Sequence, residues 1–94
     1  MARQFYWVYV LYSQKDRKKY IGFTRNLKRR FGEHNAGKNR STAPRRPFIL
    51  IFAEVYISKE DAMRREKYFK TNEGKKTLKL MLKESLKEIV PGQP

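Results

Sequence analysis

Aromatic and β-branched residues follow one another almost without interruption over residues 5–12. A run of this composition is typical of a strand that is covered on both faces. After a polar turn at residues 14–18, the shorter apolar stretch 19–23 predicts a second strand, paired antiparallel with the first. Gly22 falls where this second strand is expected to end, and its missing Cβ permits an unusual backbone angle or the close approach of another group.

The next segment has the spacing of a helix. Thr24 and Asn26 are both suitable N-caps for a helix that runs to about residue 35. The side chains on its inner side would be Leu27, Phe31 and His34. Residues 36–37 would end this helix. The stretch 38–47 contains two prolines and many basic residues, and it predicts a loop without regular structure.

A third strand is predicted at residues 48–57, because its alternate positions are uniformly apolar. We expect that face to pack against helices, and its members are Ile49, Ile51, Ala53, Val55 and Ile57. Ser58 then precedes Asp61 by three residues, the spacing of an N-cap and a third helical position. The helix that they open should continue through Lys70.

Residues 71–74 interrupt the helical pattern, and a last amphipathic helix follows. Its predicted buried stripe contains Leu78, Met81, Leu82, Leu86 and Ile89. Residues 1–90 are expected to form one domain, and residues 91–94 a flexible tail. The element order β-β-α-β-α-α predicts a small α+β domain in which helices flank a three-stranded, mostly antiparallel sheet.

Composition narrows the class of protein. The 94 residues suit a single domain with a modest core, and the hydrophobic fraction of 39% is sufficient for folding. The absence of cysteine excludes disulfides, cysteine-ligated zinc and thiol nucleophiles. No apolar run has the length of a signal peptide or a membrane span, so we expect a cytoplasmic protein without a membrane partner.

The net charge of +14 favours polyanionic partners. Nucleic acid is the chief candidate, although an acidic membrane surface or a ribosome would also be attracted. Residues 25–46 contain eight basic residues and one acid, a net charge of +7. The predicted nucleic-acid contacts are Arg25, Lys28, Arg29, Lys38, Arg40, Arg45, Arg46 and the later Lys70. The alternative is that these cations form an ordinary solvated surface.

Two tyrosines are candidates for chemistry. Tyr9 and Tyr20 fall on strands joined by a hairpin, so their side chains can approach each other on one face. A phenol can orient a water molecule, or act as a base when its proton is stabilised elsewhere. Aromatic residues in strands are more often simple packing residues, and the chain has six tyrosines and six phenylalanines.

Arg30 and His34 are four residues apart and project from the same side of the predicted helix. Arginine can clamp a phosphate and offset the charge that grows during phosphoryl transfer. A nearby histidine can move a proton or hold a water molecule. Alternatively, Arg30 is one basic residue among several, and His34 interacts with free carbonyls at the helix end.

Glu66 is an acid on the apolar side of the helix predicted after Ser58, together with Ala62 and Phe69. A carboxylate in this position needs a compensating partner. One candidate is a divalent cation, held by a single carboxylate together with water and substrate phosphates. The other is an ion pair with Arg30 or Lys70.

These residues occur in an order that resembles the GIY-YIG nucleases. Trp7-Val8-Tyr9 stands where that family has Gly-Ile-Tyr, and Tyr20-Ile21-Gly22 matches the second motif. Arg30 with His34 looks like the helix-borne pair of the family, and Glu66 looks like its metal-binding glutamate. The similarity covers about residues 5–77. Within the family, the chain most resembles the compact stand-alone bacterial members that are related to the nuclease domain of the bacterial excision-repair enzyme.

The resemblance implies hydrolysis of a DNA phosphodiester with one Mg²⁺ or Mn²⁺ ion. Tyr9, or a water beside it, would deliver the nucleophile, while Tyr20 and His34 support proton transfer. Arg30 would stabilise the pentavalent phosphate, and Glu66 would hold the metal. We therefore expect an endonuclease that nicks branched, damaged or single-stranded DNA in repair or recombination, with residues 38–46, the basic loop, on the DNA backbone.

Two other classes of function remain open on the sequence. A protein with the same fold can bind nucleic acid without cutting it, because fold alone does not decide function. A structural protein could instead dock its last amphipathic helix on a partner. Glu66 favours catalysis, since a surface meant only for polyanions has no use for a carboxylate.

Overall fold

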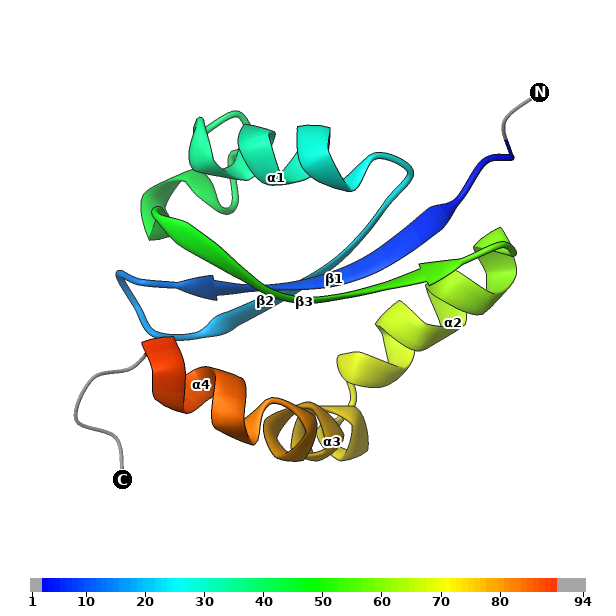
Figure 1. Cartoon of the computed structure of the whole chain (residues 1–94). Helices are drawn as coiled ribbons and strands as arrows, with labels where there is room; N and C mark the ends of the chain where they lie inside the picture. The colour runs from blue at the N-terminus through cyan, green and yellow to red at the C-terminus, as the bar shows by residue number, and fades with distance from the viewer. Residues whose placement is uncertain (1–2, 90–94) are drawn as a thin grey trace.

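The computed structural model describes residues 3–89, so the expected tail at residues 91–94 lies outside the described part. Three strands form one antiparallel sheet in the order β2-β1-β3, and they span Tyr6–Ser13, Lys19–Thr24 and Phe48–Tyr56 in chain order. Helices flank this sheet on both faces (Figure 1). The predicted α+β class and the β-β-α-β-α-α order are confirmed, with one added 3₁₀ turn.

The central strand β1 supplies both halves of the core, as its unbroken apolar sequence predicts. Successive side chains on a strand point to opposite faces. Val8 and Val10 therefore join the cluster that contains Phe69. Tyr9 and Leu11 face the other way, where they pack with side chains of the first helix.

That first helix, α1, spans Leu27–Asn35 and lies on one face of the sheet, together with the loop that follows it (Figure 1). Asn26 is its N-cap, and the side chain accepts a hydrogen bond from the backbone N–H of Arg29. The chain turns at Gly37, whose φ of +77° lies in the left-handed region that favours glycine. The predicted irregular loop that follows includes the 3₁₀ turn η1, Ala43–Arg45.

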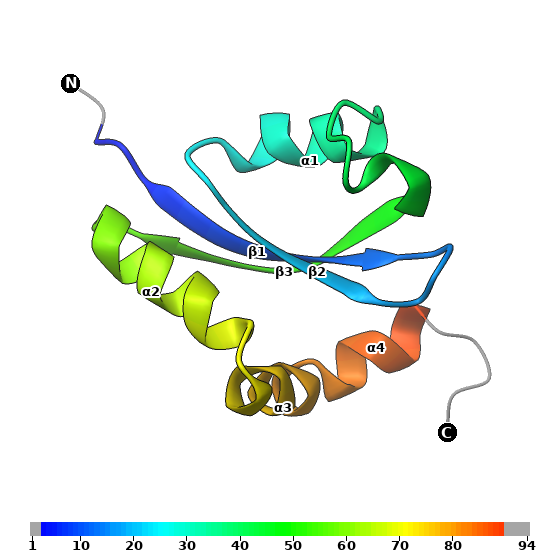
Figure 2. The same cartoon turned by 180° about the vertical axis from the view of Figure 1, so that it is seen from behind.

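Three helices cover the opposite face: α2 (Lys59–Phe69), α3 (Asn72–Met81) and α4 (Lys83–Ile89) (Figure 2). Ser58 caps α2 as predicted, accepting from the N–H of Asp61. The predicted break at residues 71–74 is shorter than expected, because α3 already begins at Asn72. Thr71 is its N-cap and accepts a hydrogen bond from the backbone N–H of Gly74. No helix among residues 3–89 is long and apolar enough to cross a membrane.

Two expectations about buried faces are wrong. The last helix divides at Leu82 into α3 and α4, and Met81 is 44% exposed instead of lying on the buried stripe. Val55 of β3 is 48% exposed, and Ile57, which follows the end of the strand at Tyr56, is 61% exposed. The five positions also do not share one face, because β3 carries an extra residue, Ile51, opposite the step from Val10 to Leu11. Ile51 therefore packs with the cluster that contains Phe69, whereas Ala53 packs with the cluster that contains Tyr9.

Candidate active site

Tyr9 lies on the face of the sheet that α1 covers, directly opposite Gly22 of β2. A Cβ added at Gly22 would lie 2.3 Å from both Cζ and Oη of Tyr9, so the phenol ring occupies the space that any side chain would fill. The close approach expected at Gly22 is therefore confirmed. Its expected place at the strand end is wrong, because β2 continues to Thr24.

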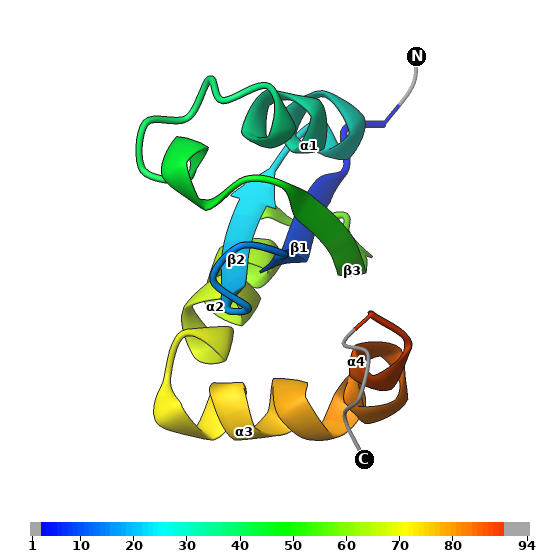
Figure 3. The same ribbon diagram turned by 90° about the vertical axis from the view of Figure 1, so that its left-hand side faces the viewer.

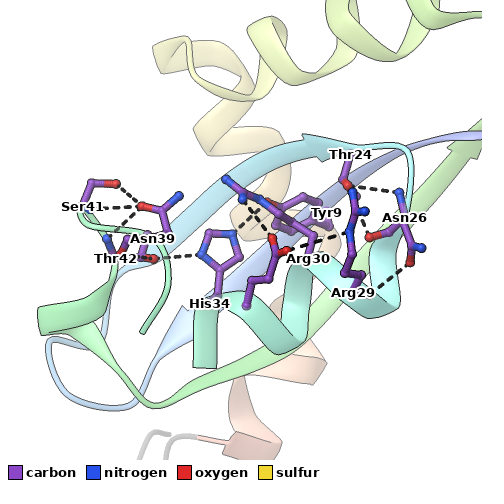
Figure 4. A network of polar contacts seen from close by, with 10 residues as sticks. Tyr9, Thr24, Asn26, Arg29, Arg30, His34, Asn39, Ser41 and Thr42 are labelled. Atoms are coloured by element: carbon purple, nitrogen blue, oxygen red, sulfur yellow. Dashed lines mark hydrogen bonds and ion pairs between the residues drawn. The ribbon is translucent and has the colours of Figure 1, made fainter. Parts of the chain in front are cut away.

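A chain of hydrogen bonds connects Tyr9 to the basic loop (Figure 4). The Tyr9 hydroxyl lies 2.9 Å from Nε2 of His34, and Nδ1 of the same ring lies 2.8 Å from Oγ1 of Thr42. His34 and Thr42 are both fully buried. Thr42 was not among the predicted site residues, because a threonine in an irregular loop has no periodic signal.

The surroundings of Thr42 indicate which imidazole nitrogen carries the proton. Its Oγ1 lies 3.5 Å from the carbonyl oxygen of Asn39, which can only accept a hydrogen bond. When the hydroxyl hydrogen is directed there, Oγ1 can accept from the Nδ1–H of His34. The partners thus assign the tautomer in which Nε2 accepts the hydroxyl hydrogen of Tyr9.

Burial keeps both of these rings neutral near pH 7. Removal from water raises the pKa of Tyr9 to about 12, and the guanidinium of Arg30 offsets only part of this rise. Burial also lowers the pKa of His34, which the positive charge of Arg30 lowers further. In the resting site the phenol therefore donates and the imidazole accepts, which is the direction in which a proton would move from Tyr9 to His34.

Tyr20 packs against the rings of Tyr9 and His34. Its ring centroid lies 6.4 Å from that of Tyr9 and 5.0 Å from that of His34, which it meets edge to face. Phe48 also meets the imidazole edge to face, with a centroid distance of 6.0 Å. The two tyrosines share one face of the hairpin as predicted, and the surrounding rings restrict the orientation of His34.

Arg30 lies one helical turn before His34, at the solvent edge of the site. Its side chain is 35% exposed, and its Nη1 lies 3.2 Å from a carboxylate oxygen of Glu33. The guanidinium is close enough to the phenol to influence the pKa of Tyr9. A partly exposed guanidinium beside a buried hydroxyl is suitably placed to meet a phosphate that arrives from solvent.

Glu66 lies on α2, on the face of the sheet opposite to α1. Its negative charge nevertheless contributes to the raised pKa of Tyr9. Its carboxylate forms an ion pair with Lys70, with 3.1 Å between Oε2 and Nζ. Of the two ion pairs considered for Glu66, the described structure contains this one and not the pair with Arg30. Lys70 is thereby engaged within the protein, although its side chain is 56% exposed.

The chemistry around Glu66 fits a metal that takes few protein ligands. Among residues 3–89, no group of three or more histidine, cysteine, aspartate or glutamate side chains comes together to enclose an ion. Magnesium commonly binds one or two carboxylates and completes its shell with water and substrate phosphates. The Glu66 side chain is 24% exposed, and its exposed lysine partner can move away at small cost.

The predicted DNA-contacting cations do not all face solvent equally. Seven of the eight are exposed: Arg25, Lys28, Arg29, Lys38, Arg40, Arg46 and Lys70. Arg45 is instead partly buried, with Nε 2.5 Å from a carboxylate oxygen of Asp16 and the guanidinium 5.7 Å from the Phe48 ring centroid. Arg46 donates from Nε to the carbonyl of Ala43 at 2.8 Å. The Arg45 contacts position η1 against the β1–β2 turn and the start of β3, whereas the Arg46 contact lies within η1 and its C-cap.

The fold and this cluster of residues define a nuclease-type domain, and comparison with known proteins agrees. The family described as the GIY-YIG catalytic domain matches residues 5–79, close to the predicted range of 5–77. The chain belongs to the GIY-YIG nuclease family, whose domain is associated with cleavage of phosphodiester bonds in DNA.

Similar proteins are small stand-alone members of this family. The UPF0213 protein YazA of Bacillus subtilis is 44% identical over 78 residues, which are 81% of this chain and 79% of that protein. A UPF0213 protein of Staphylococcus haemolyticus is 40% identical over 77 residues, covering 81% and 93% of the two chains. The solution NMR structure of a UPF0213 protein from Bacillus halodurans has a TM-score of 0.52 at 35% identity, covering 82% and 84%.

Proposed function

We propose that this chain is a divalent-metal-dependent DNA endonuclease that nicks one strand of branched, damaged or single-stranded DNA. Its setting would be cytoplasmic DNA repair or recombination. The observation that best supports catalysis is the buried hydrogen bond between Tyr9 and His34, which has Arg30 at its solvent edge and the charge of Glu66 within range. A surface that only binds DNA does not require this arrangement.

In the proposed reaction, the phenol and the imidazole move protons in sequence. A water molecule attacks the phosphorus and gives a proton to Oη of Tyr9, while Tyr9 gives its own proton to Nε2 of His34. Thr42 holds the other ring nitrogen throughout, so the imidazole does not rotate away. Tyr20 keeps bulk water from the ring pair through its edge contact with His34.

Arg30 and Glu66 have separate electrostatic roles in this proposal. The guanidinium of Arg30 would bind the oxygens of the pentavalent phosphate as negative charge develops. Glu66 would hold one Mg²⁺ or Mn²⁺ ion, which polarises the phosphate and neutralises the leaving oxygen when bound. Binding of the metal would release Lys70 from its ion pair with Glu66, and the ammonium group of Lys70 could then contact the DNA backbone.

The alternative function is a nucleic-acid-binding module that does not cut. The observation that favours it is the Glu66–Lys70 ion pair, because a carboxylate neutralised by lysine needs no metal. Under this alternative, the exposed cations of α1 and the basic loop would still contact phosphates, and the Tyr9–His34 bond would be a satisfied polar contact in the core.

Nicking of supercoiled plasmid with Mg²⁺ or Mn²⁺ separates the two functions. We expect Glu66→Gln to abolish nicking and Arg30→Ala to reduce it by about 10²- to 10³-fold, as for other removed charge-stabilising groups. Glu88→Gln is the matched control, because it removes the same charge from an exposed glutamate on α4. Wild-type protein that binds DNA firmly but nicks with neither metal would establish the binding module instead.

A further inference from the structure

A second group of cations lies on the face of the sheet opposite to α1. A pocket of about 390 Å³ opens between the β1–β2 turn and α3. Its lining consists of Arg17, Lys18, Lys19, Ile21, Lys75 and Leu78. Four of these six residues are basic and none is acidic, so the pocket concentrates positive potential over an apolar floor.

These four cations have no ion-pair partner among residues 3–89. The nearest acid in sequence, Asp16, is already engaged by Arg45. Burial lowers the pKa of Lys19, and repulsion from the nearby Lys79 lowers it further. An anion in the pocket would relieve both the repulsion and the lack of counter-charge.

The backbone of the turn supports a role for one of these side chains. Arg17 has a φ of +61°, in the left-handed region where glycine or asparagine is usually found. A bulky residue there costs conformational energy that a glycine would avoid. The arginine side chain nevertheless lines the pocket, so its charge stands beside those of the lysines despite the cost in the backbone.

The pocket and the candidate active site are on opposite faces of the same edge strand. Tyr20 of β2 contributes to the α1 face, whereas Ile21 contributes to the face with α3. Figure 3 shows α1 and α3 on either side of β2, which forms one edge of the sheet. A DNA segment lying along α1 would occupy one face, so phosphates bound by the cations on the other face would belong to a second segment.

We propose that the pocket formed by Arg17, Lys18, Lys19 and Lys75 binds backbone phosphates of a second DNA segment, so that the protein holds two arms of a branched DNA across the edge of β2. This inference rests on the proposed DNA-binding function of the α1 face. Lysine and arginine on phosphates position a nucleic acid without reading its sequence. The preferred substrate class is therefore a fork or junction.

The test compares forked DNA with a linear duplex of about 10 base pairs, which is one helical turn. Fluorescence anisotropy is measured with EDTA present, so binding is observed without cleavage. The pocket variant is Lys18→Gln/Lys75→Gln. Its matched control is Lys67→Gln/Lys87→Gln, which removes the same charge from exposed positions outside the pocket.

For the pocket variant on the fork, we expect the slope of log affinity against log salt to decrease in magnitude by about two, because two fewer phosphates are neutralised. The linear duplex should bind the pocket variant and the control alike. Equal decreases on both DNAs, or equal effects of the two variants on the fork, would overturn the inference in favour of general electrostatic attraction. Competition by free pyrophosphate at the pocket alone would also overturn it, because a small anion would then be the ligand.

Arg17→Gly tests the same pocket without risk of unfolding. Removing the left-handed arginine should raise the thermal midpoint by up to about 4 °C while weakening fork binding. Unchanged fork binding in this variant contradicts the inference. Failure of the proposed nuclease has a different outcome: a protein that prefers forks through this pocket but never nicks DNA supports the inference and refutes the enzyme.

Discussion

The contact between Gly22 and Tyr9 makes a sharp prediction about the candidate active site. In Gly22→Ala, the new methyl group would lie 2.3 Å from Cζ and Oη of Tyr9, and 2.8 Å from Cε1. Carbon atoms in proteins do not approach this closely, so the ring must move. The rotation would pull the hydroxyl away from Nε2 of His34, which lies 2.9 Å away in the native structure.

The magnitude follows from the packing of the site. Overfilling a packed core costs about 1–3 kcal/mol, and each kcal/mol lowers the thermal midpoint of a domain this size by about 4–8 °C. We therefore expect a fall of at least about 4 °C. A displacement of about 1 Å in a catalytic group can cost 10²-fold in rate, so the proposed nicking activity should fall by about this factor.

Gly32→Ala provides the matched control on α1. A Cβ at Gly32 meets no atom within 4 Å, and alanine stabilises a helix interior by about 1 kcal/mol relative to glycine. The same substitution should therefore raise the thermal midpoint at position 32 and lower it at position 22. Thermal unfolding followed by circular dichroism measures both.

A double-mutant cycle with Tyr9→Ala identifies the cause. With the ring removed, the new methyl group of Gly22→Ala has no clash, so its cost should shrink by about 1–3 kcal/mol. If Gly22→Ala costs the same in both backgrounds, strain in the β2 backbone rather than contact with Tyr9 causes the instability. That result would refute the steric explanation for the glycine at position 22.

Two further predictions concern His34. Thr42→Val removes the hydroxyl that accepts from the Nδ1–H of His34, so the nicking rate should fall about tenfold or more and its pH profile should shift. The affinity for DNA without metal should stay unchanged. Thr42→Ser keeps the hydroxyl and should restore both the rate and the pH profile. Stability should decrease as the pH falls through 6.5, because burial lowers the pKa of folded His34 and the unfolded chain then binds more protons. Thermal midpoints from pH 8 to pH 5 should show a smaller decrease in His34→Gln than in the wild type.

Features that depend on local interactions were predicted well from the sequence. The N-caps Asn26 and Ser58 each accept from a backbone N–H three residues ahead, so their signal is contained in a few neighbouring positions. The burial of β1 on both faces followed from its unbroken apolar run. The placement of Tyr9 and Tyr20 on one face followed from the period of two along each strand.

Features that depend on distant segments were not predicted. Thr42 meets His34 only because η1 folds back against the sheet, where Arg45 pairs with Asp16 from the β1–β2 turn. No pattern within the loop indicates either contact. The position of Val55 has the same origin, because it depends on the extra residue, Ile51, that β3 carries opposite the step from Val10 to Leu11 of β1.

These contacts change how the basic loop should be tested. The turn Asn39–Thr42 is closed by Oδ1 of Asn39, which accepts from the backbone N–H of Ser41 and of Thr42. In this turn Arg40 faces solvent, whereas Thr42 contacts His34. Alanine at Arg45 and Arg46 together would loosen this turn and alter the imidazole as well as the DNA surface. Arg40→Ala removes an exposed cation alone, so it separates phosphate binding from the positioning of His34.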